Sequence, residues 1–275
     1  MEQPLYLPAA PGPLFGVLHR PEGDGAPRAA VLFLPPALDE KRASYGAMAR
    51  LARRLAQAGC AALRFDPYGT GDSAGDSTDV SVSSMERDAA AAAGFLRGRC
   101  PGAELALVGV RLGASLALRL GPPLGAAKVA AVAPIASGAN WLRQERGRRT
   151  LRRSMIAREL AGRGSGGDAP AFPSEALPPG AAEDLEGLPL SAGFIAELGA
   201  LDLLAGEPLA PGAPAALLVQ VSPRKSPLAE TEALARRFGA RVACLGIEPF
   251  WQPLEHPSVD ELAACLQEFL GGVRP

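Results

Sequence analysis

The chain has 275 residues, a length that fits one large α/β domain or one domain with an inserted cap. Hydrophobic residues make up 48% of the sequence and charged residues 21%, and the formal net charge is −1. This balance excludes recognition of nucleic acid by bulk charge. No stretch approaches the roughly 18 apolar residues of a membrane span, and the first residues lack a signal-peptide pattern, so we expect a cytoplasmic protein.

Cysteine and histidine usage argues against a metal site. The four cysteines are scattered through apolar segments, as expected of buried thiols in a reducing compartment. The two histidines, His19 and His256, lie far apart in the sequence, so no metal-binding cluster is expected. The chain also lacks the G-x-G-x-x-G and G-x-x-x-x-G-K-S/T motifs, and we expect no cofactor.

Apolar runs alternate with segments of helical period along the chain. The runs expected to form buried strands are Ala29–Leu34, Ala61–Phe65, Leu105–Val108, Val129–Val132, Ala215–Val221 and Arg241–Leu245. Helices are expected near residues 48–55, 84–96, 112–120, 228–238 and 259–270. The alternation predicts one α/β domain over residues 1–275, with a mostly parallel twisted sheet flanked by helices. Residues 1–20 are expected to add an antiparallel hairpin at the sheet edge.

Residues 136–212 interrupt this rhythm and are expected to form a cap inserted over the carboxyl ends of the strands. Their charges are segregated. Arginines crowd the stretch from Arg143 to Arg163, whereas residues 168–207 carry acids and no lysine or arginine. Either the two halves pair with each other on the surface, or the arginine-rich half faces an anionic ligand.

Three segments at the ends of predicted strands form a recognisable pattern in their order and spacing. Residues 34–40 (LPPALDE) end the first strand, and residues 64–76 (RFDPYGTGDSAGD) end the second. Residues 105–120 (LALVGVRLGASLALRL) read as strand, sharp turn and helix. Together they resemble the α/β-hydrolase superfamily, whose nucleophilic serine lies in a G-x-S-x-G turn between a strand and a helix. The resemblance covers most of residues 29–120 and extends more weakly to the C-terminal strands and helix.

An arginine occupies the position of the nucleophile. Gly109 and Gly113 match the glycines of the motif, and Arg111 stands between them where the serine is expected. The resemblance assigns the oxyanion hole to the backbone N–H groups of Ala37 and Leu112, because the two prolines before Ala37 have no N–H to donate.

A shifted frame, Gly113-Ala114-Ser115, would place a serine at the turn. It would also extend the strand through Arg111 and delay the start of the helix. In the preferred frame Ser115 lies one helical turn below the nucleophile position, where a small side chain helps packing.

Within the superfamily, the segments PPALDEK, YGTGDSAGD and RLGA resemble the α/β-hydrolase-like proteins associated with the exosortase system, specifically the second of the two families so described. This resemblance implies a cytoplasmic bacterial protein encoded among genes for exopolysaccharide production and protein sorting.

The remaining members of a Ser–Asp/Glu–His triad are only partly present. The acid is expected after Ala215–Val221, but the sequence there (VSPRKSPLAE) has no aspartate, and Glu230 already lies in the next helix. The histidine is expected before the last helix, where His256 stands. The alternative for His256 is a surface-loop histidine without a catalytic role. His19 falls in the N-terminal hairpin and is expected to be structural or exposed.

Arg111 cannot be a nucleophile, because its guanidinium stays protonated and has no usable lone pair. It is expected at a helix N-terminus, where the macrodipole disfavours a cation by roughly 0.3–1 kcal/mol unless an anion neutralises it. We therefore predict an anionic partner. The candidates are a protein carboxylate on a loop at the same sheet edge (Asp39, Glu40 or Asp66) or the carboxylate or phosphate of a ligand.

Two functions follow. The first is a degenerate hydrolase kept as a binding or accessory protein, with an anionic small molecule or an acyl compound as its ligand. The second is an active hydrolase for an anionic acyl ester or thioester, in which His256 acts as a general base on water and Arg111 stabilises an oxyanion or holds the substrate.

Overall fold

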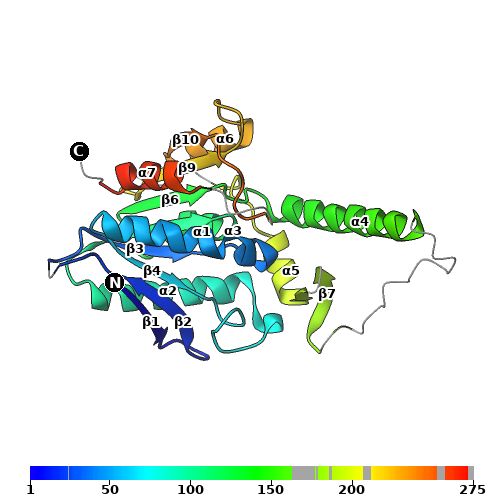
Figure 1. Cartoon of the computed structure of the whole chain (residues 1–275), viewed down its shortest axis with the longest axis horizontal. Coiled ribbons are helices and arrows are strands. Elements are labelled where there is room, and N and C mark those ends of the chain that lie inside the picture. Colours follow the sequence, from blue (N-terminus) through cyan, green and yellow to red (C-terminus); the bar gives the residue numbers. More distant parts are fainter. Residues whose placement is uncertain are drawn as a thin grey trace.

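The structure is a computed structural model, and it describes residues 1–23, 25–162, 177, 179–185, 188–206, 212–252 and 258–271. An eight-stranded sheet forms its centre, in the order β1-β2-β4-β3-β5-β6-β9-β10 (Figure 1). The strands of this sheet are β1 (Glu2–Leu7), β2 (Leu14–His19), β3 (Ala29–Leu34), β4 (Ala61–Phe65), β5 (Glu104–Val110), β6 (Lys128–Val132), β9 (Ala215–Val221) and β10 (Arg241–Leu245). β7 (Ala181–Leu185) and β8 (Leu188–Ser191) pair separately as an antiparallel hairpin.

Neighbouring strands from β4 across to β10 pair in parallel, and helices connect them. The expected N-terminal hairpin is present, because β1 and β2 pair antiparallel and β2 joins the sheet antiparallel to β4. The helices are α1 (Leu38–Gln57), α2 (Val82–Arg99), α3 (Leu112–Leu120), α4 (Gly138–Gly162), α5 (Ala192–Gly199), α6 (Ala229–Phe238) and α7 (Asp260–Phe269), with a short 3-10 turn, η1 (Ser77–Asp79).

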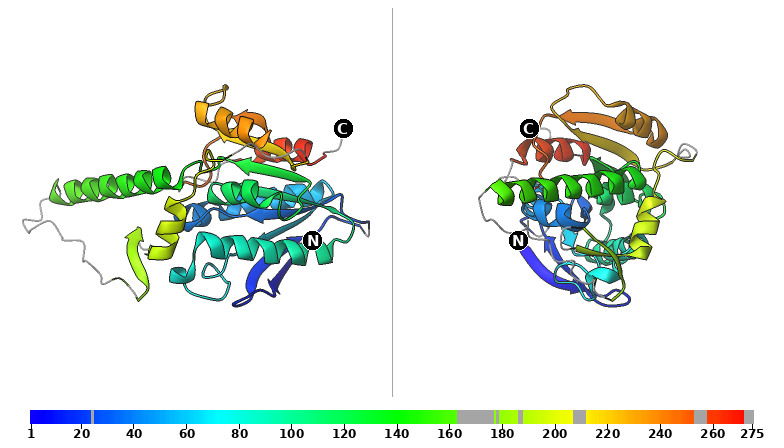
Figure 2. Two further views of the ribbon diagram at one scale, coloured as in Figure 1. Left: turned by 180° about the vertical axis from the view of Figure 1, so that it is seen from behind. Right: turned by 90° about the vertical axis from the view of Figure 1, so that its right-hand side faces the viewer.

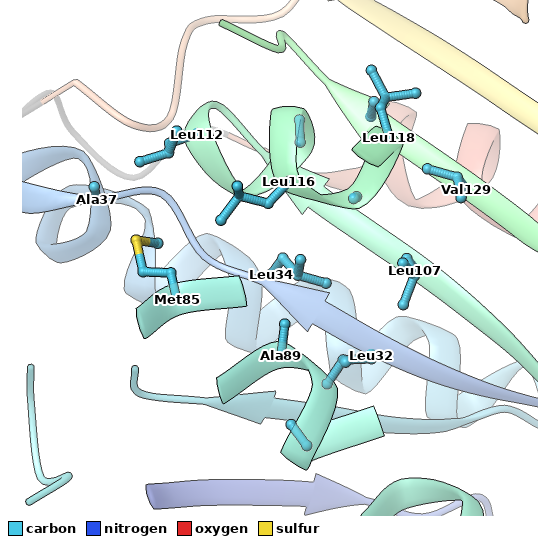
Figure 3. Close-up of a cluster of buried hydrophobic side chains, with 14 of the residues drawn as sticks. Leu32, Leu34, Ala37, Met85, Ala89, Leu107, Leu112, Leu116, Leu118 and Val129 are labelled. Carbon is cyan, nitrogen blue, oxygen red and sulfur yellow. The ribbon is translucent and has the colours of Figure 1, made fainter. Parts of the chain in front are cut away.

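Helices cover both faces of the sheet (Figure 2). Val31 and Phe33 of β3 pack in one buried cluster with α1 and α7, whereas Leu32 and Leu34 pack in a second cluster with α2 and α3. Figure 3 shows part of that second cluster. Because both faces are buried, the central strands read as unbroken apolar runs rather than as an alternation of apolar and polar residues.

The expected strands and helices are all present, and the largest difference is the start of α1. The helical pattern is clearest from residue 48, but the helix begins at Leu38, with Ala37 as its N-cap after the double proline. Asp39 and Glu40, expected on a loop, therefore lie in the first turn of α1. That turn accepts negative charge well, because the backbone N–H groups and the macrodipole favour carboxylates there.

The chain between β6 and β9 carries α4, the β7–β8 hairpin and α5. α4 extends beyond the end of the sheet, as both Figure 1 and Figure 2 show. Arg146 of α4 forms an ion pair with Glu183 of β7 at 2.6 Å, and Arg149 lies 3.6 Å from Asp184. Two arginines of α4 thus face two acids of β7. Within the described ranges, no helix is both long and apolar enough to cross a membrane.

Candidate functional site

The turn between β5 and α3 has an unusual backbone. Arg111 adopts φ +55° and ψ −118°, in a region that disfavours side chains. Its backbone N–H donates to the carbonyl of Val132 at 2.9 Å, and α3 begins at the next residue. A non-glycine residue held in such a conformation costs about 1–3 kcal/mol, and the surrounding structure must enforce it.

The two glycines flanking this turn are required by close packing. A Cβ on Gly109 would lie 2.2 Å from the carbonyl oxygen of Gly113, and a Cβ on Gly113 would lie 2.1 Å from the carbonyl oxygen of Leu34. The helix therefore starts directly against the ends of β3 and β5. This is the geometry that presents the residue between the glycines at the carboxyl edge of the sheet.

Ser115 is not available as an alternative nucleophile. Its side chain is fully buried in α3, where its hydroxyl donates to the carbonyl of Ile135 at 2.8 Å and accepts from the N–H of the same residue at 2.9 Å. The frame with Arg111 at the turn is the one that the structure adopts. Ser115 instead ties α3 to the segment after β6.

Within the part of the chain that the structure describes, the guanidinium of Arg111 contacts a carboxylate, a backbone carbonyl and an aromatic ring. Its Nε donates to Oε1 of Glu40 at 2.9 Å, and one terminal nitrogen donates to the carbonyl of Ala133 at 3.1 Å. Its central carbon lies 5.3 Å from the ring centre of Trp251, in cation–π contact. The side chains of Arg111 and Glu40 are only 16% and 11% exposed. A protein carboxylate thus supplies the anion that a cation at this helix end needs.

The environment of Glu40 is unfavourable to charge without Arg111. Burial raises the pKa of Glu40 above its usual value, while the charge of Arg111 and its hydrogen bond oppose that rise. A second carboxylate, Glu145, also raises the pKa of Glu40. Arg111 is therefore the group that opposes the effect of burial on Glu40.

The comparisons with known proteins agree with this geometry. The sequence profile of a family described as serine aminopeptidase, S33, matches residues 26–159, slightly less than half of the chain. Among solved structures, Est1E from Butyrivibrio proteoclasticus with bound ferulic acid superposes with a TM-score of 0.66 at 14% identity, covering 97% of each chain. The chain has the α/β-hydrolase fold.

Two further solved structures share the α/β-hydrolase fold with this chain. Proline iminopeptidase from Mycobacterium smegmatis has a TM-score of 0.64 and 13% identity, with 98% of this chain and 97% of that chain covered. An esterase from Pyrococcus furiosus has a TM-score of 0.61 and 14% identity, with 98% and 90% covered. A search of curated proteins found no significant match.

Within this α/β-hydrolase fold, the other carboxylates considered as partners of Arg111 are committed elsewhere. Asp66, after β4, forms an ion pair with Lys41 at 2.7 Å. Asp39 pairs with Arg42 at 3.1 Å on the surface of α1. Ala37 is the N-cap of α1, and Leu112 is the first residue of α3, so the two proposed oxyanion-hole residues stand at two neighbouring helix starts.

The loop after β9, which carries the triad acid in α/β-hydrolases, is held here by hydrogen bonds to the side-chain amide of Gln220. Gln220 accepts from the N–H of Leu228 at 2.7 Å and donates to the carbonyl of Ser226 at 3.2 Å. No carboxylate stands in residues 222–228. His256, expected at the triad histidine position, lies outside the described residues.

The contact of Trp251 with Arg111 was not predicted from the sequence. Trp251 lies in the segment between β10 and α7, the same connection that holds His256, and it stacks edge-on against Phe250. Two adjacent aromatic residues after the last strand of the fold were the available signal. Both side chains are buried, Phe250 with 2% and Trp251 with 8% exposure.

Backbone strain gathers at this edge. Among the described residues, the non-glycine positions with positive φ are Leu38, Arg111 and Ala133, which follow β3, β5 and β6. Those strands are neighbours in the sheet. Strain of this kind clusters at functional sites, and two of the three residues take part in the Arg111 network.

A cavity of about 580 Å³ lies beside the Arg111 network, and its described lining includes neither Arg111 nor Glu40. Ala37, Leu38 and Lys41 form part of one wall, and residues of the β4–α2 loop form another. β8 and α5 contribute Leu190 and Phe194. Within the described ranges, no group of three or more histidine, cysteine, aspartate or glutamate side chains is arranged to hold a metal ion.

Proposed function

We propose that this α/β-hydrolase-like protein is a degenerate hydrolase that acts by binding and forms no acyl-enzyme. The observation that carries the proposal is that Arg111 stands at the nucleophile position, where it contacts Glu40, the Ala133 carbonyl and Trp251. Acyl transfer by the serine route needs an activated hydroxyl where the guanidinium stands. The absence of an acid in residues 222–228 supports the same conclusion independently.

The ligand we propose is an acyl or related organic compound rather than an anion bound by Arg111. Glu40 already neutralises Arg111, so a second anion at that guanidinium would meet a buried carboxylate. The inserted residues 136–212 are proposed to act as a cap, because β8 and α5 contribute side chains to the cavity beside the elbow.

The cellular setting is proposed from sequence resemblance alone. The PPALDEK, YGTGDSAGD and RLGA segments favour a cytoplasmic bacterial protein of the exosortase-associated group, acting as an accessory component in exopolysaccharide production or protein sorting.

An active enzyme with an altered mechanism is the second candidate. It is favoured by the retained elbow, in which Arg111 keeps a strained backbone between Gly109 and Gly113. In that mechanism His256 would be the general base for a water molecule, and Arg111 would stabilise the oxyanion.

Ester and thioester turnover separates the two functions. We expect no hydrolysis above the buffer rate with p-nitrophenyl esters and with acyl thioesters that carry a terminal carboxylate. Turnover that is lost in both His256→Ala and Arg111→Ala would overturn the binding function and establish the second candidate. His19→Ala is the control that removes the other histidine.

A further inference from the structure

The cavity beside the elbow has the size and the walls of a small-molecule site. Its volume of about 580 Å³ lies inside the range of roughly 300–1,000 Å³ that such sites occupy. The apolar side chains that dominate its walls come from four separate segments: Leu38, Val80, Met85, Leu188, Leu190 and Phe194. An occupant must therefore bury a substantial apolar body.

One ion pair is the most buried polar feature of this cavity. Nζ of Lys41 lies 2.7 Å from Oδ1 of Asp66, and the two side chains are 14% and 7% exposed. Asp66 is fixed further, because its other oxygen accepts from the N–H of Asp72 at 3.2 Å and a Cβ on Gly71 would lie 2.1 Å from that oxygen. Lys41 has three N–H donors, and this contact with Asp66 uses one of them.

Other polar side chains in the lining are already engaged or face water. The hydroxyl of Thr70 donates to the carbonyl of Pro67 at 2.8 Å. The hydroxyl of Ser191 accepts from the N–H of Phe194 at 3.1 Å. Arg42 is 84% exposed and pairs with Asp39. Lys41 is thus the buried group best placed to donate a hydrogen bond to an occupant.

The charge balance of the pair decides what kind of polar group it accepts. Lys41 and Asp66 neutralise each other, so a carboxylate or an ammonium group placed beside them would add an uncompensated charge in a largely apolar cavity. A hydroxyl or carbonyl oxygen accepts from Lys41 without adding charge.

We propose that this cavity binds an uncharged amphipathic molecule, with its apolar body against the walls and a hydroxyl or carbonyl oxygen accepting from Nζ of Lys41. The proposal rests on the binding function above and names its ligand class. It also places the ligand beside the Arg111–Glu40 pair rather than on it.

Displacement of the neutral dye Nile red by three compounds of equal chain length tests the ligand class. The compounds are decanol, decanoate and decylammonium at pH 7. We expect decanol to displace the dye at a concentration about tenfold or more below either charged compound, a difference equivalent to about 1.4 kcal/mol. Displacement that is strongest with decanoate, or equal with all three, would overturn the proposal.

Two charge variants sharpen the test. In Lys41→Met the unpaired carboxylate of Asp66 is expected to shift the preference to decylammonium, and in Asp66→Asn the unpaired ammonium of Lys41 is expected to shift it to decanoate. The two variants are independent, so one folded variant is sufficient. An unchanged preference in a folded variant would overturn the role of the pair.

A filling variant locates the site. Leu188→Trp places a large ring on the cavity wall and is expected to weaken dye binding at least about tenfold, whereas Leu204→Trp, outside this lining, leaves it unchanged. Equal binding by the two variants would place the dye elsewhere and overturn the proposal. Such an outcome leaves the proposed lack of catalysis intact, whereas ester turnover would overturn that lack of catalysis whatever the dye does.

Discussion

Replacing Arg111 by methionine would leave the carboxylate of Glu40 buried without its cation. Removing one partner of a fully buried ion pair costs about 3–5 kcal/mol. The two side chains here are 16% and 11% exposed, and Glu40 can relieve part of the cost by taking up a proton. We therefore expect Arg111→Met to lower the free energy of unfolding by about 2–3 kcal/mol at pH 7.

The double variant Arg111→Met/Glu40→Leu is expected to recover most of that loss, to within about 1 kcal/mol of the wild type, because two apolar side chains need no compensation. Urea unfolding of the wild type, both single variants and the double variant gives the coupling energy. Additive effects, with a coupling below about 0.5 kcal/mol, would refute the description of Arg111 and Glu40 as a mutually dependent buried pair.

The same variant has a defined pH dependence. Burial raises the pKa of Glu40 in the folded chain above its ordinary value of 4.5. A carboxyl with a raised folded pKa contributes stability that is complete below pH 4.5 and is lost as the pH rises through the folded value. Loss of Arg111 removes the opposing charge, so the penalty of Arg111→Met is expected to be larger at pH 8 than at pH 5. An equal penalty at both pH values would contradict this reasoning.

Three further predictions concern the scaffold around the site. Burial and Arg64 lower the pKa of His19 from 6.5 to about 4. The stability that neutral His19 contributes, about 3 kcal/mol, is therefore complete above pH 6.5 and is lost as the pH falls towards 4. In urea unfolding, the stability of His19→Gln should depend less on pH over this range, and an unchanged pH dependence would refute the prediction. Gly113→Ala should destabilise the fold by more than about 2 kcal/mol in thermal unfolding. Its control, Gly94→Ala, adds a Cβ that meets no other atom on the exposed side of α2 and should be neutral or stabilising. Equal effects of the two variants would contradict the close packing of the elbow. Ser115→Ala should cost about 2 kcal/mol by the same measurement, because both backbone groups of Ile135 lose their partner, and a change below about 0.5 kcal/mol would refute that role.

Pattern alone predicted the fold because its central strands are buried on both faces. The runs Ala29–Leu34, Ala61–Phe65 and Ala215–Val221 coincide with β3, β4 and β9. The start of α1 was missed because its first two turns lack a clear apolar stripe, and helix propensity after a double proline is a weak signal.

The site was predicted less completely because its contacts depend on how segments that are distant in the sequence come together in the fold. Asp39, Glu40 and Asp66 were equivalent as partners in the sequence, and the helical start at Leu38 decides between the first two by turning adjacent side chains about 100° apart. Asp66 instead forms an ion pair with Lys41, which lies on the same helix as Asp39 and Glu40. The contact of Trp251 with Arg111 joins segments 140 residues apart, which local pattern does not reveal. The segregated charges of residues 143–207 left pairing with each other and pairing with a ligand open, and the ion pair of Arg146 with Glu183 favours the first.

Intact-mass measurement after treatment with a fluorophosphonate tests the central claim most directly. The reagent adds covalently to the activated serine of a serine hydrolase. With Arg111 at the elbow and Ser115 buried in α3, we expect the mass of the folded wild-type chain to stay unchanged. A stoichiometric adduct that disappears in His256→Ala would show an activated nucleophile and contradict the account.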